Sequence, residues 1–401
     1  MSLMLRKLKH SILIALMKFI IGLKDHIRHF AFSGSGASAQ LCAHIVRLGF
    51  TKVLVVTDKP LRDLGIVDKA IVGLREAGVD VAIYDGVLPD PTFEQVAEGA
   101  AVLREHGSEA VLAVGGGSSM DAAKVIAACA NSDESPAEWV GFGKLKHDVL
   151  KLFAIPTTSG TGSEATMGAV ISDSATHAKS IITGPQLTPT ATALDPDLIT
   201  GLPPHITAAT GMDALTHAIE AYIGLWDRGT RLEDAAAAVK LIFENLPTAY
   251  HEGTNLKARE AMAIASYYGG IAINQVNVGN VHAIAHQLGG KYGIPHGLAN
   301  ALVLPHVLEF SRIESQASLA QLAIIAGLGE KGESEEQLAF NFIKGVKDLR
   351  TEVGIPDNSD KIQPADYAEI CAAAIAEGDM YPVPKLLEES AVLSILASIT
   401  A

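Results

Sequence analysis

Between about residues 30 and 200, short β-branched runs alternate with longer segments of helical spacing, and this alternation constrains the fold more than any other feature. Buried-strand signals stand at residues 53–56, 79–84, 110–114 and 151–155. Helical patterns lie between them, at residues 67–77, 93–106 and 120–130. Strand–helix alternation at this spacing predicts a parallel sheet covered by helices. Ligands of such sheets sit at the carboxyl ends of the strands.

The pattern changes near Gly201-Leu202-Pro203-Pro204. Beyond it, strand signals are sparse, and long Ala- and Leu-rich segments have helical spacing, at residues 208–222, 232–245, 256–273 and 335–351. We therefore expect three parts, which are a helical N-terminal extension over 1–30, an α/β domain over 31–200 and an all-helical domain over 201–401. Because candidate motifs fall in both halves, a site between the two domains is the natural expectation.

Composition excludes several classes of protein. Apolar residues make up 48% of the 401 residues, so the chain can bury a large core and is not disordered. The 31 basic and 45 acidic residues give a net charge of −14, which disfavours nucleic acid as a partner. The three cysteines, Cys42, Cys129 and Cys371, are far apart, so neither a disulfide framework nor a thiolate zinc site is expected. This cysteine usage fits a reducing compartment, and we expect a cytoplasmic protein.

The N-terminal extension has an amphipathic pattern. Seven apolar residues share one face of a helical wheel, namely Leu5, Leu8, Ile12, Leu16, Phe19, Leu23 and Ile27. Four basic residues lie mostly opposite, namely Arg6, Lys18, Lys24 and Arg28. The apolar stretch is too short to span a bilayer, and Lys18 interrupts its loose likeness to a signal peptide. The helix could pack on the body or on another subunit, or it could lie on a membrane surface. We expect packing, and therefore no membrane partner.

A glycine-rich turn follows the strand expected at 110–114. The sequence Gly115-Gly116-Gly117-Ser118-Ser119 separates that strand from the next helical segment. Glycines let the backbone approach a ligand closely, and free N–H groups at a helix start attract an anion, so this arrangement can hold a phosphate. The alternative is a tight turn in which Ser118 or Ser119 caps the helix.

A second polar turn follows the strand expected at 151–155. Residues 156–164 offer several hydroxyl and N–H groups, including those of Thr157, Thr158 and Thr161. Two such turns after parallel strands favour a nucleotide more than either turn alone. Asp58 follows the strand at 53–56 and could accept hydrogen bonds from ribose hydroxyls, which would favour NAD over NADP. For Asp58 the alternative is an ordinary helix cap.

Histidines and one carboxylate gather in the helical half. Asp213 and His217 are four residues apart in one helical segment, and so are His282 and His286 in another, while His296 follows ten residues later. A carboxylate with imidazoles suits Fe(II), Zn(II) or a similar ion, with room left for a substrate oxygen. For any single histidine a hydrogen-bonded, partly buried side chain is the alternative, but the crowding of the set favours a metal site.

Together these residues resemble the iron-containing (group III) alcohol dehydrogenase family, over nearly the whole chain after the N-terminal helix. The segments that carry the resemblance are, in order, 32–37, 55–58, 115–121, 156–164, 211–220, 282–286 and 295–300. The resemblance implies an N-terminal Rossmann-like dinucleotide-binding domain with a parallel sheet, followed by a C-terminal helical metal-binding domain. This arrangement is the dehydroquinate synthase-like fold.

The resemblance also implies roles for single residues. The metal ligands fall on Asp213, His217, His282 and His296, and His286 matches a histidine that lies beside the metal without binding it. His286 is therefore the candidate catalytic proton carrier. The residues that the resemblance assigns to the cofactor are Gly115, Gly116, Gly117 and Ser118 at the pyrophosphate, Asp121 just after them, Thr157, Thr158 and Thr161 in the second loop, Lys179 near the ribose, and Asp58.

The activity implied is NAD-dependent alcohol dehydrogenation (EC 1.1.1.1) with Fe2+, or Zn2+ in its place, by a homodimer or larger homo-oligomer. Hydride would pass reversibly between a small primary alcohol or aldehyde and NAD(H), with the metal polarising the alcohol oxygen. A zinc-dependent, glycerol dehydrogenase-like polyol oxidoreductase is the main alternative. A dehydroquinate synthase-like lyase is disfavoured, because the metal-site segments are poor in basic residues apart from Lys291. A protein that binds NAD or metal without turnover is a further alternative.

Overall fold

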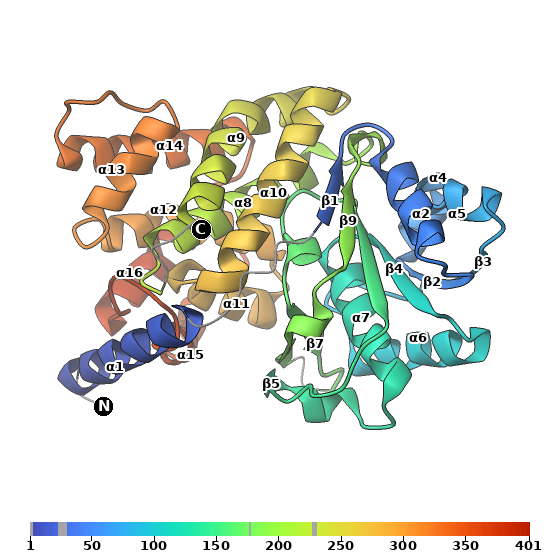
Figure 1. The fold of residues 1–401 in the computed structure, drawn as a ribbon. Helices are drawn as coiled ribbons and strands as arrows, with labels where there is room; N and C mark the ends of the chain where they lie inside the picture. Colours follow the sequence, from blue (N-terminus) through green and yellow to red (C-terminus); the bar gives the residue numbers. More distant parts are fainter. Residues whose placement is uncertain (1–2, 23–29, 176–177, 227–230) are drawn as a thin grey trace. The chain divides into compact units, whose positions relative to one another are not determined.

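The structure is a computed structural model that describes residues 3–22, 30–175, 178–226 and 231–401 (Figure 1). The chain divides into two compact units, each with its own core. An α/β unit comprises residues 27–202 and 254–267, and a helical unit comprises residues 1–26, 203–253 and 268–401. The segment 254–267 thus belongs to the α/β unit although it follows part of the helical unit in the sequence.

A six-stranded sheet forms the centre of the α/β unit, and all of its strand pairings are parallel. The strands, in spatial order, are β1 (Phe30–Ser33), β9 (Ala191–Leu194), β6 (Lys151–Pro156), β4 (Ala110–Gly115), β2 (Lys52–Val56) and β3 (Asp80–Tyr84). This confirms the predicted parallel sheet, and four strands lie where the sequence indicated. Val56 pairs with Ala113 and Gly115 pairs with Pro156, so the carboxyl ends of β2, β4 and β6 share one edge.

Helices cover both faces of this sheet (Figure 1). On one face, Val53 and Val55 of β2 share a core with helices α2 (Ala37–Arg47), α4 (Ile66–Ala70) and α5 (Val72–Glu76). On the other, Leu54 and Val56 share a core with α6 (Phe93–His106) and α7 (Gly117–Ala128). Alternate residues of a strand point to opposite faces, and here both faces are buried. This is why the run at 53–56 is apolar throughout instead of alternating with polar residues.

Two helix predictions in this unit need correction. The helix expected over 67–77 is two short helices, because Ile71, between α4 and α5, has φ −106° and ψ 7° and leaves the helical conformation. The helix expected from residue 120 begins at Gly117, and its N-cap is Gly116. Ser118 and Ser119 therefore lie in the first turn, and the alternative in which one of them caps the helix is wrong.

Several elements of the unit gave no sequence signal that we recognised. The edge strand β1 and its neighbour β9 have four residues each. A second sheet of three strands contains β5 (Gly141–Phe142), β8 (Lys179–Thr183) and β7 (Gly168–Ser172), with β7 and β8 antiparallel. The short helix α3 (Lys59–Asp63) follows β2.

The helical unit confirms the predicted all-helical domain. Its helices after α1 are α8 (Pro204–Ile223), α9 (Arg231–His251), α11 (Asn280–Tyr292), α12 (His296–Phe310), α13 (Gln316–Ile325), α14 (Glu335–Glu352), α15 (Tyr367–Gly378) and α16 (Glu389–Ile399). Helix α10 (Leu256–Val276) has its first residues in the α/β unit and its last in the helical unit. Helix α8 packs against α9 and α12, and α11 packs against α12 and α15.

The N-terminal helix α1 (Leu3–Gly22) packs on the helical unit through a face that the sequence pattern did not indicate. Arg6 donates two hydrogen bonds to the Asp379 carboxylate, at 2.6 and 2.8 Å, and His10 Nε2 donates to the Tyr381 carbonyl at 2.9 Å. Ile14 is buried beside them.

The apolar face identified from the sequence is exposed instead. Its described members, Leu5, Leu8, Ile12, Leu16 and Phe19, are 44% to 67% exposed. Leu23 and Ile27 lie outside the described residues. Among the residues that the structure describes, no helix combines the length and the hydropathy needed to cross a bilayer.

Candidate metal and nucleotide sites

Helix α8 places Asp213 and His217 on one buried face of the helical unit. The helix begins with Pro204, whose fixed φ suits a first helical position, and its alanines favour the helical conformation along its length. Gly211 permits the close packing of α9, because a Cβ at this position would lie 2.3 Å from Leu246. The four-residue spacing that the sequence indicated therefore holds both side chains at one place in the core.

Helix α11 presents His282 in its first turn, and Glu220 of α8 holds that turn. The Glu220 carboxylate accepts hydrogen bonds from the backbone N–H groups of Gly279 and Val281, at 2.8 and 2.6 Å. It also accepts one from His282 Nδ1, at 2.6 Å. Since Glu220 is an acceptor for all three donors, we assign the His282 proton to Nδ1, which leaves Nε2 unprotonated.

Helix α12 begins at His296, directly after Pro295. A Cβ on the neighbouring Gly297 would lie 2.3 Å from the Ala209 carbonyl oxygen, so only glycine lets this end of α12 approach α8 so closely. Four residues after His296, the Asn300 amide nitrogen donates to Asp213 Oδ1 at 2.7 Å. The same nitrogen lies 3.1 Å from His282 Nε2 and 3.2 Å from His296 Nε2.

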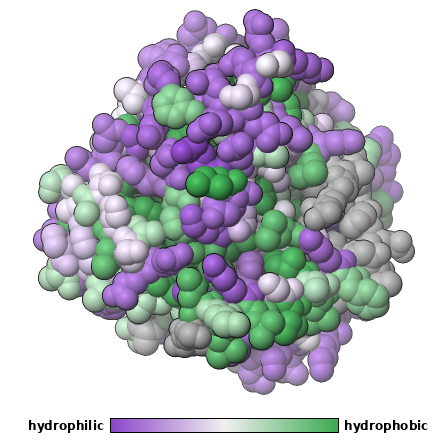
Figure 2. Space-filling view, turned by 90° about the vertical axis from the view of Figure 1, so that its left-hand side faces the viewer, coloured by the Kyte–Doolittle hydropathy of each residue, from purple (hydrophilic) through white to green (hydrophobic). Residues whose placement is uncertain are grey.

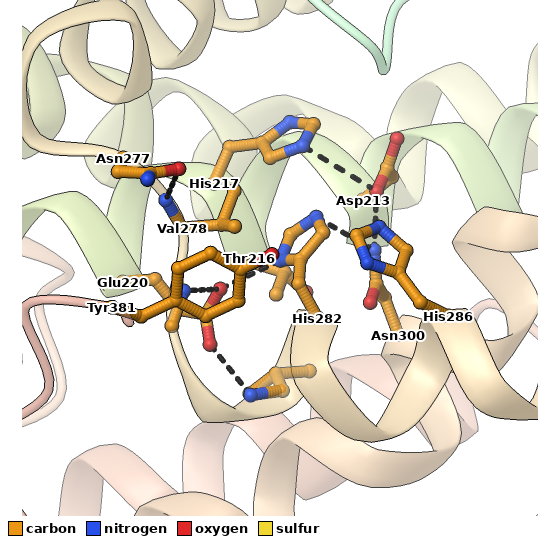
Figure 3. A network of polar contacts seen from close by, with 12 residues as sticks. Asp213, Thr216, His217, Glu220, Asn277, Val278, His282, His286, Asn300 and Tyr381 are labelled. Carbon is orange, nitrogen blue, oxygen red and sulfur yellow. Dashed lines mark hydrogen bonds and ion pairs between the residues drawn. The ribbon is translucent and has the colours of Figure 1, made fainter. Parts of the chain in front are cut away.

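Three helices thus bring Asp213, His217, His282 and His296 together. One potential ligand atom from each of the four lies within 4.8 Å of the others. Figure 3 shows Asp213, His217, His282 and Asn300 pointing toward one another. Three electron-pair donors, one oxygen and two imidazole nitrogens, converge on the Asn300 amide nitrogen, and the Asn300 Oδ1 atom is buried without a partner among the described residues. This donor set fits a divalent cation with nitrogen and oxygen ligands.

The electrostatics of the cluster keep these donors available. Burial lowers the pKa of His282 well below its usual value, and the neighbouring His217 and His286 lower it further. Burial likewise lowers the pKa of His296 to about 3, although Asp213 opposes this shift. Burial alone would raise the pKa of Asp213, but His217, His296 and His282 outweigh it and lower that pKa. Near neutral pH His282 and His296 therefore offer neutral imidazoles and Asp213 offers a carboxylate, which are the forms that bind metals.

His286 lies beside this group and has partners of its own. Its ring stacks on the His296 ring with centroids 5.4 Å apart, and its Nδ1 donates to Glu377 Oε1 at 2.6 Å. Tyr381 donates to the same oxygen at 2.6 Å, and Gln287 donates to the other Glu377 oxygen at 2.7 Å. Among the described residues, His286 is outside the set of four whose ligand atoms converge. Its Nε2 is the ring nitrogen that remains for other partners.

In the α/β unit, the two polar turns of the sequence emerge side by side. They follow the paired strands β4 and β6, and the Thr157 backbone N–H donates to the Gly115 carbonyl at 2.9 Å. A Cβ at Gly117 would lie 2.7 Å from the Thr161 methyl group, and one at Gly116 would lie 3.4 Å from Thr158. The free N–H groups at the start of α7 and the hydroxyl groups of the second turn therefore share one small surface.

Asp58, Asp121 and Lys179, the other predicted cofactor residues, have partners within the unit. Asp58 follows the carboxyl end of β2 by two residues and caps α3, accepting a hydrogen bond from the Leu61 N–H at 2.9 Å. Asp121 accepts hydrogen bonds from Ser163 Oγ and the Val170 N–H. Lys179 lies at the start of β8 and pairs with Asp90 at 2.6 Å.

Lys124 links α7 to the end of the second turn and to β7, and the sequence gave no reason to select it. It lies in α7, is fully buried, and donates to Ser163 Oγ, Thr166 Oγ1 and the Gly168 carbonyl at 2.6 to 3.1 Å. Glu164 is also buried, and burial raises its pKa to about 7, although Lys124 opposes the shift.

Other supporting residues were also missed. Glu220 stands three residues after His217, and Asn300 stands four after His296, so helical spacing could have indicated both. Glu377 is 91 residues from His286, and no local pattern links them.

Comparisons with known proteins identify the family. The family model for iron-containing alcohol dehydrogenase matches residues 29–196, and the model for the C-terminal part of the Fe-containing alcohol dehydrogenase family matches residues 207–400. The 1,3-propanediol dehydrogenase of Klebsiella pneumoniae is 39% identical over 370 residues, which cover 91% of this chain and 95% of that protein. The NAD-dependent methanol dehydrogenase of Bacillus methanolicus is 40% identical over 80% of this chain and 85% of its own length.

A solved structure agrees with these matches. The crystal structure of a 1,3-propanediol oxidoreductase superposes with a TM-score of 0.90 at 38% identity, covering 93% of this chain and 98% of that one. The two family matches together span most of the chain, and both the α/β unit and the helical unit have counterparts in that structure. The chain therefore belongs to the iron-containing alcohol dehydrogenase family.

Proposed function

We propose that this protein is an NAD-dependent alcohol dehydrogenase that uses a divalent metal ion, and that this ion is Fe2+. The observation that carries the proposal is the convergence of Asp213, His217, His282 and His296 within 4.8 Å, held by Glu220 and Asn300. In this proposal the α/β domain over 31–200 binds NAD, and the helical domain over 201–401 holds the metal and the substrate. A bound ion would supply Lewis-acid polarisation of an alcohol oxygen, and NAD would supply the hydride acceptor.

The substrate we propose is a small primary alcohol, or the corresponding aldehyde in the reverse direction. Relatives at about the same similarity are named for different small substrates, namely 1,3-propanediol, methanol and lactaldehyde. These names favour a short aliphatic substrate without selecting one. The direction of the reaction is a matter for measurement.

The ligand residues are positioned before any substrate arrives. Glu220 fixes the ring orientation and tautomer of His282, and Asn300 links Asp213 with the Nε2 atoms of His282 and His296. Such outer partners make a metal site stiffer and raise the basicity of its ligands.

His286 is the residue we propose to carry the hydroxyl proton. Glu377 holds its Nδ1, so Nε2 is the atom that would accept the proton from a substrate hydroxyl, directly or through water. Glu377 would stabilise the resulting imidazolium, because its carboxylate accepts the Nδ1–H bond at 2.6 Å.

For the cofactor, we propose that the two turns after β4 and β6 bind the phosphates. The backbone N–H groups of Gly116, Gly117 and Ser118 at the start of α7 would face them, beside the hydroxyls of Thr158 and Thr161. Asp58 uses Oδ1 to cap α3, which leaves Oδ2 for a ribose hydroxyl.

The experiment that tests the proposal is reconstitution under anaerobic conditions. The metal-free protein is loaded with Fe(II) or Zn(II), and NADH formation is followed with ethanol, 1-propanol, 1-butanol and 1,2-propanediol. Activity that requires Fe(II) and NAD supports the proposal. Activity with Zn(II) alone would favour the glycerol dehydrogenase-like alternative. Metal binding without turnover of any alcohol or aldehyde would contradict hydride transfer.

A replacement of His286 tests its role separately. We expect His286→Ala to lower turnover roughly 100-fold while the metal content stays at the wild-type level. Metal loss in this variant would show that His286 is a ligand and would contradict the proton-carrier assignment.

The lyase alternative receives no support from the surroundings of Lys291. Lys291 is the main basic residue of the metal-site segments, and it pairs with Asp366 at 3.0 Å and with Glu369. A lyase site for an anionic substrate requires positive groups that are not already neutralised by carboxylates.

A further inference from the structure

An apolar stripe on helix α1 is exposed to solvent along most of the helix. Its members are Met4, Leu5, Leu8, Ile12, Leu16 and Phe19, with exposed fractions from 44% to 84%. Figure 2 shows the side of the molecule that includes this helix, and hydrophobic side chains gather in its lower part. At 100° per residue the six positions fall within about one third of the helix circumference. Single exposed apolar residues need no explanation, but a continuous stripe of this kind marks a contact surface.

The stripe faces outward because the opposite face of α1 is fixed. Arg6 donates to both oxygens of Asp379 and to the Leu387 carbonyl, and its side chain is only 11% exposed. His10 donates to the Tyr381 carbonyl, and Ile14, one turn further along the helix, is buried. These contacts set the rotation of α1 about its axis. The apolar stripe is therefore held in its exposed position and does not result from a detached helix.

The charges of α1 are all of one sign. The helix contains Arg6, Lys7, Lys9 and Lys18 and no acidic residue, in a chain whose net charge is −14. Arg6 is used in the contact with Asp379, whereas Lys7 and Lys9 are exposed. On the helical wheel Lys9 borders the apolar stripe on one side, and Lys7 and Lys18 border it on the other. An apolar stripe with lysines on both sides is complementary to a surface that is apolar within and anionic at its rim.

A second copy of this chain fits the stripe less well. From Met4 to Phe19 the helix is ~24 Å long, and with a width of ~10 Å it offers ~240 Å². A stable protein interface needs ~800 Å² from each partner. Symmetric pairing of two α1 helices would also bring their lysines together with no acidic residue of α1 to neutralise them.

From these observations we propose that α1 lies on an anionic lipid surface and attaches the protein peripherally to a membrane. Leu8, Ile12 and Phe19 would enter the boundary between headgroups and acyl chains, and the lysines would reach the anionic headgroups. The helix is already formed and oriented, so attachment would not have to fold it. The sequence alone left this alternative open beside packing on the body, and the structure shows α1 packed through one face with the apolar face exposed, so the two alternatives are compatible.

The test uses the full-length, metal-loaded protein and unilamellar vesicles. Co-sedimentation is measured with vesicles of phosphatidylcholine alone and with vesicles that also contain phosphatidylserine. We expect roughly tenfold or more tighter binding to the anionic vesicles, with a loss of affinity at high salt. Absence of binding to both kinds of vesicle would overturn the proposal.

Variants locate the contact. We expect the double variant Leu8→Glu, Ile12→Glu to abolish vesicle binding while keeping the thermal stability and the alcohol dehydrogenase activity of the parent. The matched control is Leu64→Glu, Ile313→Glu, which changes two apolar residues that are 72% and 74% exposed elsewhere, and it should bind vesicles like the parent. Equal binding by both double variants would place the contact outside α1 and refute the proposal.

Light scattering tests the alternative that a second copy of this chain covers the stripe. The mass of the assembly in solution should be the same for the parent and for Leu8→Glu, Ile12→Glu. If that variant instead forms a smaller assembly and the parent does not bind vesicles, a second copy covers the stripe and the lipid proposal is wrong.

Discussion

At the scale of single residues, Glu220 fixes the orientation of His282 in the candidate metal site. It accepts two backbone N–H bonds and the His282 Nδ1 bond, so replacement by glutamine would place an amide N–H group against at least one of these donors. We expect Glu220→Gln to weaken metal binding about 10- to 100-fold, as measured by competition with a chromogenic chelator. Glu244→Gln, on the exposed side of α9, is the control and should bind metal normally. An unchanged affinity in Glu220→Gln would show that His282 needs no such support.

Glu377 should act on turnover through His286. We expect Glu377→Gln to lower kcat roughly tenfold with little effect on metal content, because the amide cannot stabilise a protonated His286 as a carboxylate does. In the double variant with His286→Ala, the Glu377 replacement should have no additional effect on kcat. If the loss of kcat in the double variant instead equals the combined losses of the two single variants, Glu377 acts independently of His286. The pH profile of kcat is a second readout, since a purely structural role of Glu377 would not displace it.

Glu164 provides a test of stability against pH. Burial raises its pKa to about 7 from an ordinary value of 4.5, so between these values the folded protein binds more protons than the unfolded chain. The contribution of Glu164 to the free energy of unfolding is therefore most favourable below about pH 4.5, and it falls as the pH rises to about 7. We expect Glu164→Gln to remove this fall and to raise the free energy of unfolding above pH 7 by up to about 3 kcal/mol.

Urea unfolding at several pH values measures the Glu164 effect. In the variant, Lys124 keeps its hydrogen bonds to Ser163, Thr166 and Gly168, so the fold around it should persist. A variant whose stability follows the same pH dependence as the parent would contradict the raised pKa of Glu164.

At the scale of elements, the contact between the two polar turns should control cofactor affinity. Alanine at Gly117 would favour the helix by propensity but would place its Cβ 2.7 Å from the Thr161 methyl group. We expect Gly117→Ala to raise the KM for NAD roughly tenfold, because the turns must separate. Adding Thr161→Ser, which removes that methyl group, should recover most of the loss. A double variant as poor as the single one would show that the added Cβ hinders NAD itself and not the second turn.

Predictability also differed between elements. The strands β2, β4 and β6 were found because each is a mostly buried apolar run, and the partly buried edge strand β3 also has a short apolar run. Helix α6 was found to the residue. Strands β1 and β9 were missed because each has only four residues and pairs with a strand distant in sequence. For α1, periodicity gave the apolar face correctly but not its environment. Which face is buried depends on Asp379 and Tyr381, more than 370 residues away.

At the scale of the whole molecule, the sequence indicated the centre of the metal cluster but not its supports. Asp213 and His217, like His282 and His286, are recognisable because helical spacing of metal-binding residue types is a local pattern. The convergence of the four candidate ligands requires α8, α11 and α12 to pack together, and Gly297 makes part of that packing possible. Glu377, by contrast, reaches His286 only through the packing of α15 on α11, which no local pattern encodes.

This packing predicts that a bound metal ion stabilises the helices that supply its ligands. An ion that binds the folded state selectively adds about 2.7 kcal/mol at a concentration of 100 Kd, which slows exchange of the most protected amides about 100-fold. We expect this protection in α8, α11 and α12 when Zn(II) is added to metal-free protein, as followed by hydrogen exchange and mass spectrometry. Asp213→Asn should lose the protection, whereas His205→Ala, an exposed histidine on the same helix α8, should retain it. Equal protection in both variants would mean that the ion binds at a different place and that the three helices converge for packing alone.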